Sequence, residues 1–203
     1  MPQPNILLIQ ADQHRYDCLG ANGHPFVRTP NLDGLAAQGV RFSHAFCPAA
    51  VCVPSRNSLL YGQWPTEHKA IVNYPGEAPA PPAGGRPSFS RVLREAGYWL
   101  GYAGHWHIHP HVRPQDEGFH AYIPESAYDS WRSEQGLSPR PHTNRWFGEP
   151  DPAIAPEQSR LGWGADEVIR MIEGAAARRQ PFYVRWDPSE PHLPNIVPEP
   201  YAS

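Results

Sequence analysis

The sequence predicts an α/β fold built on a mainly parallel sheet, and three observations support this. Two apolar runs, residues 5–10 (NILLIQ) and 181–187 (PFYVRWD), have the length and continuous apolar character of buried parallel strands. Segments with helical periodicity lie between them, so strands and helices alternate along the chain. The runs lead into the acidic residues Asp12 and Asp187, which places polar side chains at strand ends, where open α/β sheets bind ligands.

Length and composition are those of a globular protein. The 203 residues are 40% hydrophobic, enough for a core that buries about 70% of the surface of the unfolded chain. A net charge of −3 argues against a nucleic-acid partner, and no apolar run approaches the ~20 residues of a membrane span. The N-terminal residues show no signal-peptide pattern, so we expect a cytoplasmic location, no membrane partner, and reduced thiols at Cys18, Cys47 and Cys52.

The first half of the chain predicts three elements after the first strand. A helix should begin at Pro30, be capped by Thr29 and end at Gly39. Residues 40–46 (VRFSHAF) alternate like a half-buried strand. A second helix is expected over residues 54–61, directly before a glycine.

The second half predicts two further helices and two further strands. Ser88 should cap a helix over residues 88–96, which leads into a strand at 98–104. The longest helical pattern covers residues 159–179 and precedes the strand at 181–187. These elements continue the alternation expected of a parallel sheet.

Two segments contain little periodicity, and proline is abundant in the chain, at 26 residues. Residues 74–87 form a Pro/Gly-rich loop. Residues 110–158 form a long connection, which in compact domains is usually functional or covers the active face. Its candidates for stacking on a sugar ring, with local packing as the alternative, are Trp131, Arg132, Trp146 and Phe147.

The stretch CVPSRNSLLYG carries the strongest chemical signal. Cys52 lies immediately before a helix that starts with proline, and the helix dipole and free N–H groups there favour an anion. Arg56 follows one turn later and can point back toward the same place. Both features should lower the pKa of the thiol. The pattern predicts an anion-binding or nucleophilic cysteine, with a buried structural cysteine as the alternative.

This stretch resembles the Cys-x-Pro-Ser/Ala-Arg signature of the type I, formylglycine-dependent sulfatases of the alkaline-phosphatase-like superfamily. The resemblance implies a parallel sheet flanked by helices and oxidation of Cys52 to formylglycine by a maturase. It also implies that one hydroxyl of the hydrated aldehyde attacks sulfur and displaces the alcohol. The other hydroxyl then expels sulfate. Arg56 occupies the catalytic arginine position of this signature.

The end of the first strand, ILLIQADQ, resembles the Asp-Asp or Asp-Gln metal pair of the same family. The resemblance implies that Asp12, Gln13 and the residue at position 52 bind a divalent cation. Oxygen ligands suit Ca²⁺, or Mg²⁺ or Mn²⁺, better than a soft metal. Taken alone, Asp12 is better explained as an acidic residue that caps a strand end, which is common.

Three histidines complete the resemblance. Gly104-His105-Trp106-His107 is similar to the family's Gly-Lys-Trp-His, which implies that His105 contacts sulfate in place of lysine and that His107 shuttles a proton. The charge of an imidazole depends on pH near 6.5, unlike that of an ammonium group. His192 matches a histidine that contacts sulfate and the leaving-group oxygen. A separate reading of the alternate histidines at residues 105–111 is an independent zinc site on one strand face.

The resemblance covers residues 1–203 but only the N-terminal part of the family's chain. The Asp-Asn/His-Gly metal motif and the second lysine of the family are not found in the 203 residues, so we expect residues 1–203 to be an N-terminal portion of a catalytic domain, truncated before that motif. The implied substrate is a sulfate-ester small molecule or a sulfated sugar. The alternatives are a phosphonate monoester or phosphodiester hydrolase, and a non-catalytic fragment that binds an anion. Coding sequence for Asp-Asn-Gly or Asp-His-Gly beyond Ser203 would favour the enzyme.

Overall fold

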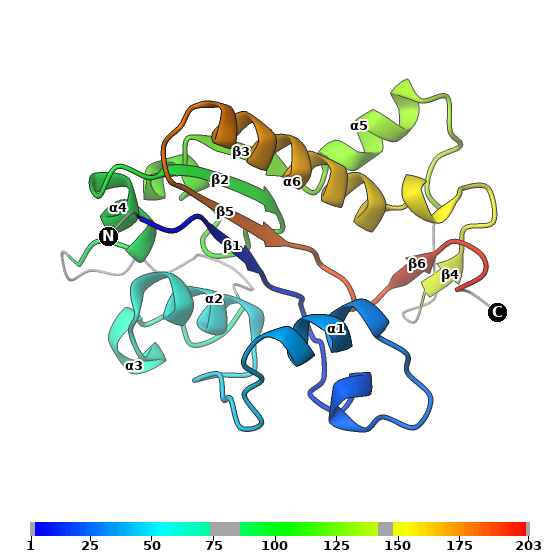
Figure 1. The fold of residues 1–203 in the computed structure, drawn as a ribbon, viewed down its shortest axis with the longest axis horizontal. Helices are drawn as coiled ribbons and strands as arrows, with labels where there is room; N and C mark the ends of the chain where they lie inside the picture. The colour runs from blue at the N-terminus through cyan, green and yellow to red at the C-terminus, as the bar shows by residue number, and fades with distance from the viewer. Residues whose placement is uncertain (1–2, 74–85, 142–147, 202–203) are drawn as a thin grey trace.

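A four-stranded parallel sheet forms the centre of the computed structural model, which describes residues 3–73, 86–141 and 148–201 (Figure 1). The strand order is β1-β5-β2-β3, and all three pairings are parallel. The prediction of a mainly parallel sheet is confirmed. The strands are β1 (Ile6–Ile9), β5 (Phe182–Asp187), β2 (Trp99–Gly104) and β3 (Ala121–Pro124).

Helix α6 (Arg160–Ala177) covers one face of this sheet (Figure 1). The Ser159 side chain caps it by accepting a hydrogen bond from the amide of Gly162. Val168, Met171 and Ala175 are buried at the three- and four-residue spacing of one helix face, and they belong to the apolar cluster that packs on this side of β2 and β5.

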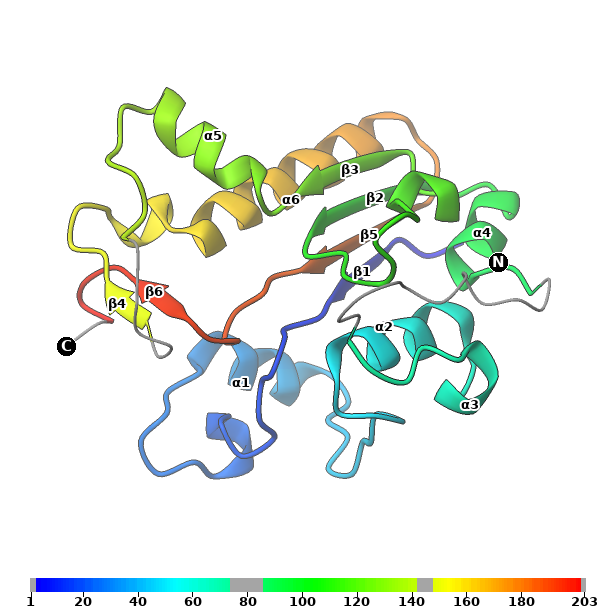
Figure 2. The same cartoon turned by 180° about the vertical axis from the view of Figure 1, so that it is seen from behind.

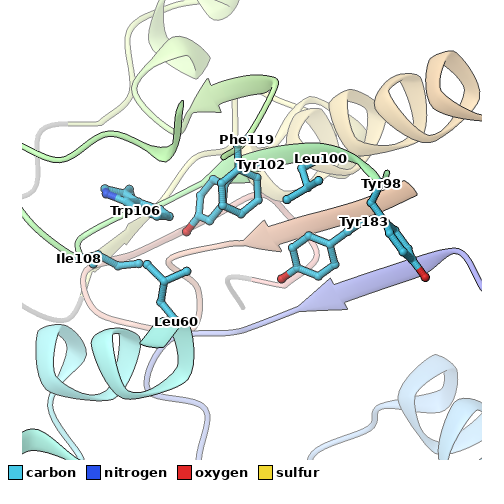
Figure 3. Packing of buried hydrophobic residues seen from close by; sticks show 8 residues of the cluster. All are labelled: Leu60, Tyr98, Leu100, Tyr102, Trp106, Ile108, Phe119 and Tyr183. Atoms are coloured by element: carbon cyan, nitrogen blue, oxygen red, sulfur yellow. The ribbon is translucent and has the colours of Figure 1, made fainter. Parts of the chain in front are cut away.

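Helices α2 (Cys52–Tyr61) and α4 (Phe89–Glu95) cover the opposite face. Figure 3 shows Leu60 projecting from α2 toward Ile108 and the sheet. Burial of each large apolar side chain stabilises the fold by about 1.5–3 kcal/mol, so this cluster fixes how α2 sits on the sheet. Its eight buried members are Leu60, Tyr98, Leu100, Tyr102, Trp106, Ile108, Phe119 and Tyr183.

The remaining elements are short and lie around this core. In the part of the chain that the structure describes, no helix is long and apolar enough to cross a membrane. Strands β4 and β6 form a separate two-stranded parallel sheet near the C-terminus (Figure 2). The elements are η1 (Gly20–Asn22), α1 (Pro30–Gln38), α3 (Pro65–His68), η2 (Pro114–Glu117), α5 (Ala127–Glu134), β4 (Gly148–Pro150), η3 (Pro156–Gln158) and β6 (Asn195–Val197).

Three expectations about local structure were wrong. Residues 40–46 form no strand, because no described strand pairs with them, and the side chains of Val40, Phe42 and Phe46 are exposed. Helix α1 begins at Pro30 as expected, but Thr29 does not cap it. Instead, the Thr29 hydroxyl accepts from the amide of Gly20 and donates to the Asp33 carboxylate, 2.8 Å away in each case.

The third error concerns the long connection at residues 110–158, which contains β3, α5 and β4. Each of these elements is too short to show a period in the sequence. Arg132 is not available to a sugar, because it is buried in an ion pair with Asp151 at 2.6 Å. Trp131 stacks on Tyr128, with ring centroids 5.8 Å apart. Trp146, Phe147 and most of the Pro/Gly segment lie outside the described residues.

Candidate functional site

Three polar residues from distant parts of the chain meet at the carboxyl end of the sheet. Asp12 follows β1, Cys52 is the first residue of α2, and His192 follows β5. One possible ligand atom from each of the three lies within 4.8 Å of the other two. The Cys52 thiol points at Oδ1 of Asp12, with a separation of 3.7 Å. The sequence placed the start of this helix at residue 54, but the structure includes Cys52 in its first turn.

Arg56 lies beneath these residues and is 1% exposed. Its Nη2 donates to Oδ2 of Asp12 at 3.0 Å, and its Nη1 donates to Oδ2 of Asp187 at 2.6 Å. The same Nη1 donates to the backbone carbonyl of His105 at 2.7 Å. One arginine therefore joins α2 to the ends of β1, β2 and β5. The two carboxylates compensate its charge.

Asp187 is fully buried. The sequence analysis placed it at a strand end, but assigned it no role in the site and did not predict the polar side chains that it organises. Besides Arg56, it accepts hydrogen bonds from the Tyr102 hydroxyl at 2.7 Å and from Nε of Arg185 at 2.8 Å. Arg185 also donates to the Gln10 side chain at 2.7 Å. The one sequence signal was the presence of Arg185 and Asp187, two positions apart, in an otherwise apolar strand.

A glycine positions the histidine pair that follows β2. Gly104 has φ of +105°, and a Cβ built there would lie 2.1 Å from the Asp187 carbonyl oxygen, so no other residue fits. The amide of His105 then donates to that carbonyl at 2.8 Å. The rings of His105 and His107 lie 4.8 Å apart, and Nδ1 of His107 is buried with no hydrogen-bond partner among the described residues.

The reading of residues 105–111 as four histidines on one strand face was wrong, because β2 ends at Gly104 and the histidines lie beyond it. Pro110 is in this segment and cannot donate to a sheet ladder.

Burial and charge set the protonation of the site. Burial lowers the pKa of His105 and of His107, and the positive charge of Arg56 lowers both further. Burial also raises the pKa of the Cys52 thiol, and the carboxylate of Asp12 adds to the increase. The expected lowering of this pKa was wrong, because burial of the thiol and the facing Asp12 outweigh the effect of Arg56, which is paired with two carboxylates.

A cavity of about 340 Å³ opens over these residues. It collects five of the residues that the sequence analysis proposed, namely Asp12, Cys52, His105, His107 and His192. Arg56 lies below and contacts Asp12. Gln13 is exposed, with φ of +55°, and it does not line this cavity. The chain also brings Arg140 and Arg160 to the wall, which the sequence analysis did not anticipate.

Comparisons with known proteins agree with this arrangement. The sequence model of the Sulfatase family matches residues 4–203. Human arylsulfatase A is 30% identical over 226 residues, which cover 98% of this chain and 43% of the relative. N-acetylgalactosamine-6-sulfatase of Mus musculus is 28% identical, with coverage of 95% and 41%.

Solved structures show the same alkaline-phosphatase-like fold. The phosphonate monoester hydrolase of Agrobacterium radiobacter superposes with a TM-score of 0.81 at 30% identity, covering 98% of this chain and 43% of that one. Ps i-CgsB in complex with k-i-k-neocarrahexaose gives a TM-score of 0.73 at 26% identity, with coverage of 95% and 46%. The chain spans less than half the length of these relatives. Since the family's sequence model extends over nearly all of the 203 residues, the chain belongs to the sulfatase family.

Proposed function

We propose that this site is part of a sulfate-ester hydrolase whose nucleophile is formed from Cys52, with the family's remaining metal ligands and lysines needed to complete it. The observation that carries the proposal is the meeting of Cys52, Asp12 and His192 within 4.8 Å at one cavity, directly above the buried Arg56. Family relatives with sulfatase names support the sulfate ester as the substrate class.

The state of the thiol supports a converted residue at position 52. Burial and Asp12 raise the pKa of Cys52, so the thiol is protonated at neutral pH and is a poor nucleophile. Formylglycine would supply a hydrated aldehyde, whose hydroxyl attacks sulfur and whose carbonyl re-forms when sulfate leaves. The first turn of α2 holds position 52, and the apolar cluster under α2 keeps that turn in place.

The side chains around position 52 have distinct roles in the proposal. Arg56 is held by three acceptors and supplies a fixed positive charge beneath the reacting group. His107 has a lowered pKa, so its neutral ring can accept a proton. His192 donates from Nδ1 to the Leu193 carbonyl at 2.6 Å, which restrains its ring. The resemblance to the family implies that this ring contacts the leaving-group oxygen. His105 contacts the sulfate.

The oxygen donors of this site suit a Ca²⁺ ion, or Mg²⁺ or Mn²⁺. Asp12 would hold it through a carboxylate oxygen, with an oxygen at position 52 as a further donor, whereas Gln13 lies outside the cavity lining. The ion would balance negative charge on the sulfate. Ca²⁺ takes about 6–8 oxygen ligands, so these two residues provide part of the shell.

Maturation is the first test of the proposal. The chain is coexpressed with a formylglycine-generating enzyme, and the tryptic peptide that contains Cys52 is weighed. Conversion of the thiol to an aldehyde should reduce its mass by about 18 Da. Cys18 and Cys47 lack the following proline and arginine and serve as internal controls that should keep their mass. An intact thiol at Cys52 would contradict the proposal.

Substrate class is the second test, since one observation favours a different ester. The phosphonate monoester hydrolase has the same fold with a TM-score of 0.81. The names of other relatives, an ulvan-active sulfatase of Formosa agariphila and N-acetylgalactosamine-6-sulfatase among them, support a sulfated sugar. Calorimetry on the matured chain should give tighter binding of phenyl sulfate than of phenylphosphonate. The reverse order would favour the phosphonate hydrolase.

A further inference from the structure

We propose that, while Cys52 carries its thiol, the chain binds a soft divalent metal ion such as Zn²⁺ through Cys52, Asp12 and His192. This site differs from the oxygen-ligated cation site proposed for the matured protein. It needs the sulfur of Cys52, which maturation removes, together with a nitrogen of His192, so it goes beyond the proposed function.

The spacing of the ligand atoms suits a tetrahedral ion. Zinc takes sulfur at about 2.3 Å and nitrogen or oxygen at about 2.0–2.2 Å, so ligand atoms around it lie roughly 3–4 Å apart. The Cys52 sulfur and Oδ1 of Asp12 are 3.7 Å apart, and the ring of His192 offers a nitrogen within 4.8 Å of both. The longest of these separations would have to contract by about 1 Å to complete the three contacts. Three protein ligands leave one position for water, as in open zinc sites.

Two of the three ligands are already oriented by a neighbour. Nδ1 of His192 lies 2.6 Å from the Leu193 carbonyl oxygen, which can only accept, so Nδ1 carries the proton and Nε2 keeps its lone pair. Metal-binding histidines commonly donate their other N–H in this way. The two oxygens of the Asp12 carboxylate have different neighbours. Oδ2 accepts a hydrogen bond from Arg56, and Oδ1 faces the Cys52 sulfur. The site therefore has outer contacts that hold two of its three ligands.

The facing donor atoms also favour a cation. Oδ1 of Asp12 lies 3.7 Å from the Cys52 sulfur, so an ion between them would contact both groups. A coordinated thiol is deprotonated, so both donors would then carry negative charge toward the ion. On binding, the S–H bond breaks, a metal–sulfur bond forms, and one proton passes to solvent with no change of oxidation state. Sulfur and imidazole donors select Zn²⁺ or Co²⁺ over Ca²⁺.

The test uses the 203-residue chain made in a host without a formylglycine-generating enzyme, with the thiol at Cys52 verified by mass. After chelation, the protein is titrated with Co²⁺. We expect one equivalent to produce a thiolate-to-cobalt charge-transfer band, which Zn²⁺ abolishes and Ca²⁺ leaves unchanged. Absence of the band at stoichiometric Co²⁺ would overturn the proposal.

Variants identify the ligands. Cys52→Ser should remove the band, and His192→Gln should weaken Co²⁺ binding at least about 100-fold. Cys18→Ser and Cys47→Ser are matched controls that should keep both the band and the affinity. A band that persists in Cys52→Ser, or that disappears in either control, would overturn the proposal. Asp12→Asn also removes a partner of Arg56, so its folding is checked by circular dichroism before its affinity is compared.

X-ray absorption spectroscopy of the zinc-loaded native chain identifies the ligand atoms and their distances from the metal without the use of variants. We expect one sulfur at about 2.3 Å and the remaining ligands at about 2.0–2.1 Å. A shell without sulfur, or with two sulfurs from two chains, would overturn the proposal. The outcome is independent of the proposed hydrolysis, because it concerns the thiol form alone and the maturation test concerns the converted form alone.

Discussion

Arg56 and Asp187 form a buried ion pair, with Nη1 of the arginine 2.6 Å from Oδ2 of the carboxylate. The pair joins the first half of α2 to the last residue of β5, elements separated by more than a hundred residues in the sequence. Arg185 shares the same carboxylate at 2.7 Å. Together with Asp12, the four side chains balance two positive and two negative charges beneath the candidate site.

This arrangement makes Asp187 a residue on which stability depends. Asp187→Asn removes the charge that two buried guanidinium groups share, and an uncompensated buried charge costs about 3–5 kcal/mol. We expect a decrease of that size in the free energy of unfolding, measured by urea denaturation. The control is Asp129→Asn, whose pair with Arg140 is 51% and 32% exposed and should contribute less than about 1 kcal/mol. Equal losses in the two variants would contradict this role.

The sequence was sufficient to predict the elements that carry long apolar patterns. The strand at 181–187, the helix over 159–179 and the helix capped by Ser88 all appear close to their predicted bounds. β3 was missed because it has four residues and ends in proline. The alternation at residues 40–46 predicted a strand, but a strand requires a partner, and partners are determined by the fold as a whole.

In the candidate site, too, some features were predictable from the sequence and others depend on the tertiary fold. Asp12, Cys52 and His192 were predicted as one site, and the segments after β1 and β5 meet the start of α2 there. The partners of Arg56 were not predictable, because Asp187 lies 131 positions away in the sequence. The pKa of Cys52 moved opposite to the prediction for the same reason, since the helix start and Arg56 are local features whereas the burial and the facing Asp12 are tertiary ones.

His68 predicts how stability depends on pH. Its side chain is buried, Nδ1 accepts from the amide of Ala70 at 3.2 Å, and Nε2 lies 2.9 Å from the Ser58 hydroxyl. Burial lowers the pKa of His68, so the unfolded chain binds more protons than the folded one below about pH 6.5. Its stabilising contribution is therefore complete above that pH and is lost as the pH falls.

The measurement is the free energy of unfolding between pH 7.5 and 5. One such histidine contributes a slope of at most about 1.4 kcal/mol per pH unit. Burial also lowers the pKa of His105 and of His107, which adds to the slope in the same direction. His68→Asn should reduce the slope, and an unchanged slope would show that His68 is not held neutral in the folded state.

His105 predicts weak anion binding at neutral pH. Burial and Arg56 lower its pKa, so the ring is neutral above pH 7 and brings no charge to the sulfate. His105→Lys places an ammonium group there, as the family's Gly-Lys-Trp-His pattern does. We expect affinity for inorganic sulfate at pH 7.5 to rise about tenfold by calorimetry, equivalent to about 1.4 kcal/mol. His111→Lys, beyond the cavity wall, is the control and should give a much smaller change.

The edge strand β1 predicts self-association of the 203-residue chain. Among the described residues β1 pairs with β5 alone, and Leu7 and Ile9 are 47% and 53% exposed. An unpaired apolar edge is a template for pairing with another chain. We expect concentration-dependent aggregation by light scattering, and Ile9→Lys should reduce it. If Ile9→Lys leaves the aggregation unchanged, the surface through which the chains associate is not the β1 edge.

Hydrolysis by the 203-residue chain should be undetectable even after conversion of Cys52. The chain contains a single lysine, Lys69, whose ammonium group donates to the Thr66 carbonyl, and His105 stands where the family carries lysine. Loss of one preorganised contact of this kind costs about 10²–10³ in rate, and several losses together leave little even though they are not additive. The measurement is release of 4-nitrophenol from 4-nitrophenyl sulfate by matured protein, with Cys52→Ala as the blank. Turnover well above that blank would show that Arg56, His107 and His192 suffice without the family's lysines and remaining metal ligands.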